Sequence, residues 1–123
     1  METRKAILTR RSVRNYEERP VPAELLEEIL EAGMYAPSAV NYQPWYFVVV
    51  QSREAMEKLV ALMGQVSVGI EPGLRERFPD HPEVVSETTG FVRKLGKAPV
   101  CILAFALRPD YPKTAESIAQ SVA

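Results

Sequence analysis

Apolar residues recur with helical spacing in two stretches of the chain. In the first stretch, Pro22 can occupy a first helical turn, and the pattern breaks near Pro37 because a residue before proline is disfavoured in a helix. The second stretch covers residues 114–123, where Thr114 is the expected cap. The predicted buried stripes are Leu25, Leu26, Ile29, Leu30, Gly33 and Met34 in the first helix, and Ala115, Ile118, Ala119, Val122 and Ala123 in the last.

An aromatic and β-branched run predicts a central strand at residues 45–50 (WYFVVV). A run that is apolar on both faces predicts a second, buried strand at residues 99–107 (PVCILAFAL). Shorter patterns predict helices at residues 2–11, 52–62 and 83–97, with Ser52 as an N-cap. Three glycines and three prolines between residues 64 and 82 predict a long loop or lid that contains one helical turn.

These elements make a small sheet for the number of helices. Two strands cannot cover their own faces, and the last helix shows no stop signal before Ala123. We therefore expect residues 1–123 to belong to one domain that lacks its C-terminal part, which a longer chain or a partner would supply.

Composition excludes several classes of protein. The chain carries 15 Lys and Arg against 16 Asp and Glu, so its net charge of −1 argues against a nucleic-acid partner. No apolar run is long enough to cross a membrane, and the N-terminus has no signal-peptide pattern, so we expect a cytoplasmic protein. One Cys and one His cannot form a metal-binding cluster, so no metal is expected.

The N-terminal segment is locally basic. In the run RRSVRNY, an extended backbone would place Arg10, Ser12 and Arg14 on one face, since alternate residues of an extended segment share a face. Two guanidinium groups flanking a hydroxyl can bind a phosphate dianion through several charged hydrogen bonds. The alternative is a pair of surface arginines that cap the end of a helix, where the dipole favours cations.

A second candidate segment is APSAVNYQPW, between the first apolar helix and the first strand. Two prolines fix an irregular loop, and Ser38, Asn41 and Gln43 supply side-chain donors and acceptors. Such a loop at a sheet edge suits recognition of a flat polar ring. The alternative is a helix stop followed by a turn, with Trp45 as a plain core residue.

Together the segments RRSVRNY, LLEEILEAGMYAPSAVNYQPWYFVVV and KTAESIAQSVA resemble, in order, the signatures of the nitroreductase family of flavin enzymes. The resemblance spans nearly the whole chain, and APSAVNYQPW is its most specific part. It implies an α+β fold with a mostly antiparallel sheet wrapped by helices, built as an intertwined homodimer. It also implies FMN at the dimer interface, reduced by NADH or NADPH and reoxidised by nitroaromatics, quinones or related small-molecule acceptors.

The resemblance assigns site residues by position. Arg10, Arg11, Ser12 and Arg14 match the segment that holds the FMN phosphate, ribityl chain and ring edge. The loop that reaches the flavin from the other subunit is matched by Pro37, Ser38, Ala39 and Asn41.

No catalytic side chain is expected. His81 lies in a proline-rich stretch and Cys101 in an apolar strand, so neither belongs to a nucleophile–base pair. In a flavin enzyme the cofactor carries the electron chemistry and the protein binds and orients it. The alternative function is a non-catalytic flavin- or nucleotide-binding protein that uses the same phosphate receptor.

Overall fold

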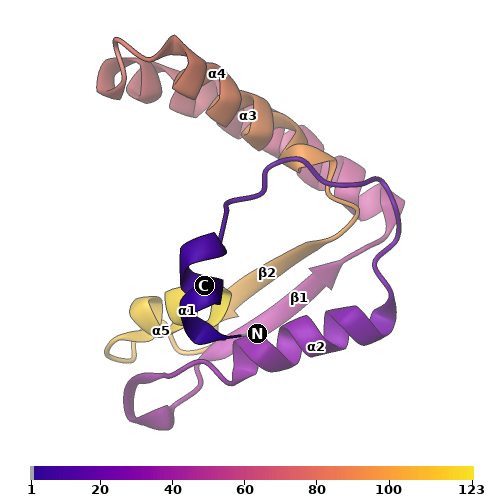
Figure 1. Ribbon diagram of the computed structural model, residues 1–123, viewed down its shortest axis with the longest axis vertical. Coiled ribbons are helices and arrows are strands. Elements are labelled where there is room, and N and C mark those ends of the chain that lie inside the picture. The colour runs from indigo at the N-terminus through magenta and orange to yellow at the C-terminus, as the bar shows by residue number, and fades with distance from the viewer. Residues whose placement is uncertain (1) are drawn as a thin grey trace. The chain divides into compact units, whose positions relative to one another are not determined.

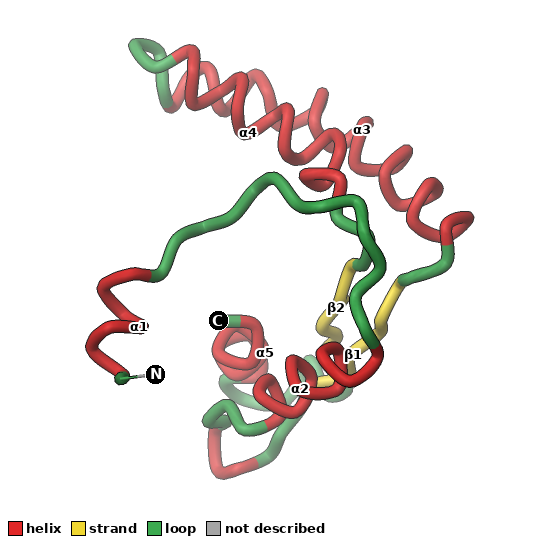
Figure 2. Tube along the Cα trace, turned by 45° about the vertical axis from the view of Figure 1, so that its right-hand side comes forward, coloured by secondary structure: helices red, strands yellow, loops and turns green. Residues whose placement is uncertain are grey.

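The computed structural model describes residues 2–123, which form two compact units (Figures 1 and 2). Unit 1 comprises the chain up to Glu18 together with Lys58–Ala98, and unit 2 comprises Arg19–Glu57 and Pro99–Ala123. The elements are α1 (Thr3–Thr9), α2 (Ala23–Met34), η1 (Ala39–Asn41), β1 (Trp45–Val50), α3 (Arg53–Arg77), α4 (Pro82–Lys94), η2 (Leu95–Lys97), β2 (Cys101–Ala106) and α5 (Thr114–Val122).

Unit 2 contains the sheet. Strands β1 and β2 pair antiparallel, from Trp45 opposite Ala106 to Val50 opposite Cys101, which confirms both predicted strands (Figure 1). Neither strand is central in this two-stranded sheet, and of their residues only Trp45 is buried, so the predicted burial of the strands is wrong. Helix α5 packs on both strands and on α2 (Figure 2). Leu26 and Trp45 are buried, at 4% and 8% exposure.

Gly33 allows a close approach of α2 to its neighbours in unit 2. A Cβ at this position would lie 3.1 Å from the Ser121 carbonyl oxygen and 3.2 Å from Cζ of Phe47. Both contacts are tighter than ordinary van der Waals packing, so a side chain here would push α2 away from α5 and β1.

The predicted apolar stripes are only partly buried. In α2, Leu26 is buried, whereas Leu25, Ile29 and Met34 keep 48%, 53% and 49% exposure. Helix α1 forms within the predicted range, but Ile7 is also exposed.

The buried face of α5 differs from the predicted alanine-rich face. Thr114, Ser117 and Ser121 are buried, while Val122 is 67% exposed. These three hydroxyl groups donate to nearby backbone carbonyls, which satisfies them and removes the main penalty of burying a polar group. Thr114 also does not cap the helix as predicted, because Lys113 occupies the N-cap position.

The predicted lid at residues 64–82 is wrong, because α3 continues through it to Arg77. Leu59, Met63, Ile70 and Leu74 are half-buried at helical spacing along the whole stretch. Gly64, Gly69 and Gly73 face open space, so they weaken the helix without breaking a packing contact. Pro72 lies inside the helix, where it removes one backbone hydrogen bond.

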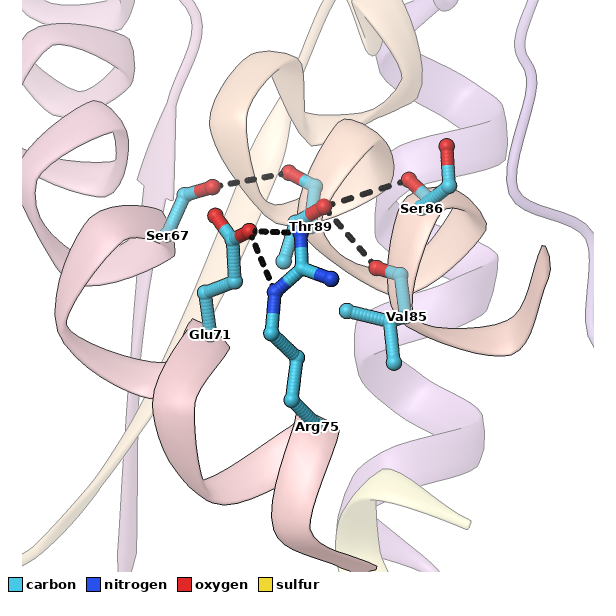
Figure 3. A network of polar contacts seen from close by, with 6 residues as sticks. All are labelled: Ser67, Glu71, Arg75, Val85, Ser86 and Thr89. Atoms are coloured by element: carbon cyan, nitrogen blue, oxygen red, sulfur yellow. Dashed lines mark hydrogen bonds and ion pairs between the residues drawn. The ribbon is translucent and has the colours of Figure 1, made fainter. Parts of the chain in front are cut away.

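Helix α4 confirms the predicted helix, although Thr89 and Gly90 are poor helix formers. Small polar residues lie between α4 and α3 (Figure 3). Ser67, which is fully buried, donates through Oγ to the Thr89 carbonyl at 3.0 Å. The Thr89 hydroxyl donates to the Val85 carbonyl at 2.8 Å, so these buried hydroxyls are satisfied.

Candidate functional site

The arginine segment, residues 10–14, follows α1 in unit 1. Arg10 Nη1 donates to Ser12 Oγ at 3.3 Å, so these two side chains share a face as an extended backbone requires. Arg11 turns back and donates to the carbonyls of Leu8 and Arg10, at 3.3 and 2.9 Å. Arg11 therefore takes the helix-capping role of the alternative interpretation, while Arg10 and Ser12 stay together at the surface.

Arg14 is held by a backbone contact with η2. The Tyr16 amide donates to the Gly96 carbonyl at 2.9 Å. Gly96 has a φ of 59°, and a Cβ there would collide with the Arg14 carbonyl oxygen. Only glycine meets both conditions without strain, so Gly96 fixes the path of the backbone at Arg14.

A basic hollow of about 440 Å³ opens beside Arg14 within unit 1. Three cations, Arg14, Lys94 and Lys97, line it against one carboxylate, that of Glu87, and Phe91 supplies an aromatic wall. The complete lining is Arg14, Asn15, Glu87, Gly90, Phe91, Lys94, Gly96 and Lys97. The excess of positive charge favours an anionic or electron-rich ligand.

The cations of the basic hollow are not equivalent. Lys97 Nζ lies 2.9 Å from Glu18 Oε1. That hydrogen bond and charge lower the pKa of Glu18 and raise the pKa of Lys97. Within residues 2–123, Arg14 and Lys94 form no ion pair, so they are the cations with charge to offer a ligand.

Sequence reasoning missed Lys94, Lys97 and Phe91 as candidate site residues. Arg93 and Lys94 lie in the last turn of α4, where a cation is ordinarily explained by the helix dipole. The contact that brings this turn to Arg14 runs through Gly96, far along the chain from the arginine segment. The one available signal was Gly96 itself, which lies between Lys94 and Lys97 a few residues before the second strand.

Two glycine substitutions separate this contact from general helix stability. Gly96→Ala is expected to lower the free energy of unfolding by about 2 kcal/mol or more. The new Cβ would collide with the Arg14 carbonyl oxygen, and alanine would also be strained at the positive φ of this position. Gly64→Ala, in the open part of α3, is expected to raise the free energy of unfolding by ~0.5–1 kcal/mol. Urea unfolding followed by circular dichroism measures both, and a neutral Gly96→Ala would contradict the proposed fit of Gly96 to Arg14.

The second candidate segment, which we call the loop (residues 36–44), lies in unit 2 and includes η1. Ser38 Oγ accepts a hydrogen bond from the backbone N–H of Gln43 at 2.9 Å, which closes the loop on itself. Asn41 Oδ1 accepts from Gln43 Nε2 at 3.2 Å. The Asn41 amide group is thereby oriented, with its own N–H donors left for a ligand.

The loop is conformationally strained. Val40, Asn41 and Gln43 have φ values of 48°, 56° and 50°. Asparagine tolerates the left-handed region, but β-branched Val40 does not, and such residues cost about 1–3 kcal/mol each. Val40 is also 83% exposed, so burial of its side chain does not explain the conformation. Strain of this kind accumulates at binding sites.

The donor sets of the arginine segment and the basic hollow fit a flavin nucleotide. Arg10 and Ser12 can bind a phosphate dianion, and the basic hollow can take the electron-rich edge of a ring system, where Arg14 and Lys94 supply positive charge. The loop, which lies in unit 2, separately presents the side-chain amide of Asn41.

Cys101 and His81 are the other residues whose side chains could take part in chemistry, and neither belongs to these clusters. Burial raises the pKa of the Cys101 thiol, which makes it a poor nucleophile. His81 contacts Glu83 at 3.0 Å beside the start of α4. Among residues 2–123, no three His, Cys, Asp or Glu side chains gather as a metal site. No helix in that range is long and apolar enough to cross a bilayer.

A family model for the nitroreductase family matches residues 7–123. The chain belongs to the nitroreductase family. Its α+β fold, with an antiparallel strand pair and packed helices, is the nitroreductase-like fold expected from the sequence.

Relatives and solved structures agree with this membership. The chain is similar to a chloronitrobenzene nitroreductase of Comamonas testosteroni, with 32% identity over 100 residues (77% of this chain, 44% of that protein). It is 47% identical over 81 residues to an NADH dehydrogenase of Thermus thermophilus (65% of this chain, 40% of that protein). A nitroreductase with bound FMN from Bacteroides fragilis superposes with a TM-score of 0.72 at 28% identity (98% of this chain, 60% of that chain). The matches thus span less than half of these curated relatives.

Proposed function

We propose that this protein is an FMN-dependent oxidoreductase that takes hydride from NADH or NADPH and passes electrons to nitroaromatic, quinone or related small-molecule acceptors. The observation that carries the proposal is the basic hollow beside Arg14, and it is supported by the contact of Arg10 with Ser12 earlier in the same arginine segment. Support comes from the family and from the FMN bound in the Bacteroides fragilis relative. We further propose a cytoplasmic homodimer.

The chain's own residues bind and polarise rather than react. Arg10 and Ser12 would hold the FMN phosphate, with Arg11 steadying the end of α1 behind them. Arg14 and Lys94 would place positive charge at the ring edge where negative charge grows on reduction. When bound, FMN supplies hydride acceptance and electron transfer to the second substrate.

The loop would complete the binding site from the partner protomer. Pro37, Ser38 and Ala39 would set the path of the backbone, and Asn41 would donate from its amide to the polar edge of the ring. When the cofactor carries the chemistry and the protein only binds and orients it, the chain needs no catalytic acid, base or nucleophile. Cys101, whose pKa is raised by burial, is in keeping with this role.

The absorption spectrum tests the proposed activity. We expect the purified protein to be yellow, to bleach when NADPH is added under argon, and to recover its colour in air. The nucleotide released by heat is identified by mass, which separates FMN from other flavins. A yellow protein that never bleaches would support the non-catalytic flavin-binding alternative and overturn the proposed enzyme.

Steady-state kinetics give a further prediction. With one flavin site and no second catalytic group, NADH or NADPH is expected to give up its hydride and leave as the oxidised nucleotide before the acceptor binds. Double-reciprocal plots at several acceptor concentrations would then be parallel. Intersecting lines would mean that both substrates bind together, and the single-site scheme would be abandoned.

A further inference from the structure

Val40 and Asn41, two of the three left-handed residues of the loop, lie between two anchors in unit 2. On one side, the Ala39 amide donates to Ser117 Oγ at 3.3 Å, and Ser117 is only 3% exposed. On the other side, the ring of Tyr42 stacks on that of Tyr111, with centroids 4.0 Å apart and planes 11° from parallel. Asn41 and its left-handed neighbour Val40 are the residues between Ala39 and Tyr42.

Both anchors belong to the segment Tyr111–Ser117, which is itself tightly bonded. Ser117 Oγ donates to the Lys113 carbonyl at 2.9 Å. The Tyr111 amide donates to the Arg108 carbonyl at 3.1 Å, and Thr114 Oγ1 donates to the Tyr111 carbonyl at 2.8 Å. The anchors are therefore fixed points, and a left-handed conformation between them can persist because its surroundings over-determine it.

We propose that Ser117 and Tyr111 are positioning residues that hold Asn41 in its left-handed conformation for contact with FMN. This inference rests on the proposed function, in which Asn41 contacts the flavin. Without the anchors the strained residues can relax, and FMN binding must then restore their order at a cost in affinity. Ser117 thus serves the cofactor site through the loop, without touching the cofactor.

The α5 helix supplies its own matched control. Ser117 and Ser121 are both buried, and both donate to carbonyls of their own helix segment. Only Ser117 also accepts from the loop. The pair Ser117→Ala and Ser121→Ala therefore separates the loop contact from the general effect of removing a buried hydroxyl.

Hydrogen exchange of the purified full chain, read by mass spectrometry, tests the anchor directly. We expect Ser117→Ala to speed exchange of the Ala39 amide roughly tenfold, because that amide loses its acceptor. Ser121→Ala is expected to leave the loop unchanged. Equal effects of the two variants would show a merely structural role and overturn the proposal.

FMN titration measures the consequence for the cofactor. Ser117→Ala and Tyr111→Leu are each expected to weaken FMN binding about three- to tenfold. Tyr111→Phe keeps the stacked ring and is expected to restore the affinity. Should Ser117→Ala fail to fold, Tyr111→Leu against Tyr111→Phe carries the test alone, and equal affinities of these two variants would overturn the proposal.

A double-mutant cycle separates this inference from the proposed function. Once Asn41→Ala has removed the flavin contact, Ser117→Ala is expected to have little further effect on FMN affinity. If Asn41→Ala leaves FMN binding unchanged, the assignment of the loop to the flavin site fails, and the positioning role fails with it. If Asn41→Ala weakens binding but the anchor variants do not, only the positioning role is overturned.

Discussion

Replacing Arg14 with alanine is expected to weaken FMN binding by roughly 10- to 100-fold, the range for loss of a charged hydrogen bond to an anionic ligand. Arg14 lines the basic hollow, forms no ion pair within residues 2–123, and has its backbone fixed by the contact of Tyr16 with Gly96. Its guanidinium is therefore placed by the fold and not already committed to a carboxylate. Quenching of FMN fluorescence by the apoprotein measures the dissociation constant.

A matched arginine controls for the loss of positive charge. Arg53 is exposed and pairs with Glu57 on the first turn of α3, so Arg53→Ala is expected to leave FMN affinity unchanged. Arg14→Lys keeps the charge but loses the planar fork, and an intermediate affinity is expected. Equal dissociation constants for Arg14→Ala and Arg53→Ala would remove Arg14 from the proposed site.

The strands were predictable because their residues carry one consistent signal. The run from Trp45 to Val50 is aromatic and β-branched throughout, and the observed strand has those bounds. The extension of α3 was not predicted because its glycines and Pro72 are typical of loops, although its apolar residues keep helical spacing. The spacing of Leu59, Met63, Ile70 and Leu74 stays helical through these glycines and Pro72, and it was the one signal in the sequence for the longer helix.

The buried face of α5 could not be predicted from hydropathy. Ser117 and Ser121 are buried because their hydroxyl groups meet carbonyls of their own helix, and such satisfaction depends on backbone geometry. Val122 is exposed in spite of its apolar side chain. Hydropathy would bury Val122 and expose the two serines, so a prediction from the apolar pattern selects the wrong face of α5.

In the candidate site, too, some features follow from local sequence patterns and others depend on contacts between distant segments. The grouping of Arg10 with Ser12 followed from local alternation, and their contact is observed. The basic hollow joins Arg14 to Lys94 through a contact at Gly96, which no local pattern encodes. The left-handed φ of Val40 likewise had no signal in the sequence, because valine ordinarily avoids that conformation.

A mixed dimer gives the largest contrast between shared and separate sites. In the proposed homodimer, each flavin site takes Arg14 from one protomer and Asn41 from the other, across a two-fold axis. Arg14→Ala and Asn41→Ala homodimers each carry a defect in both sites. In the mixed dimer, one site combines both defects and the other combines the two unaltered residues.

Counting sites under this symmetry, the mixed dimer is expected to recover about half of the unaltered activity per dimer. Co-expression of the two variants with different tags allows the mixed species to be isolated by two affinity steps, and NADPH oxidation with a quinone acceptor measures its turnover. The comparison requires both homodimers to be strongly impaired, which their own assays establish first. Activity no higher than the mean of the two homodimers would place Arg14 and Asn41 in a site formed by one protomer, because no mixed arrangement would then contain an intact site.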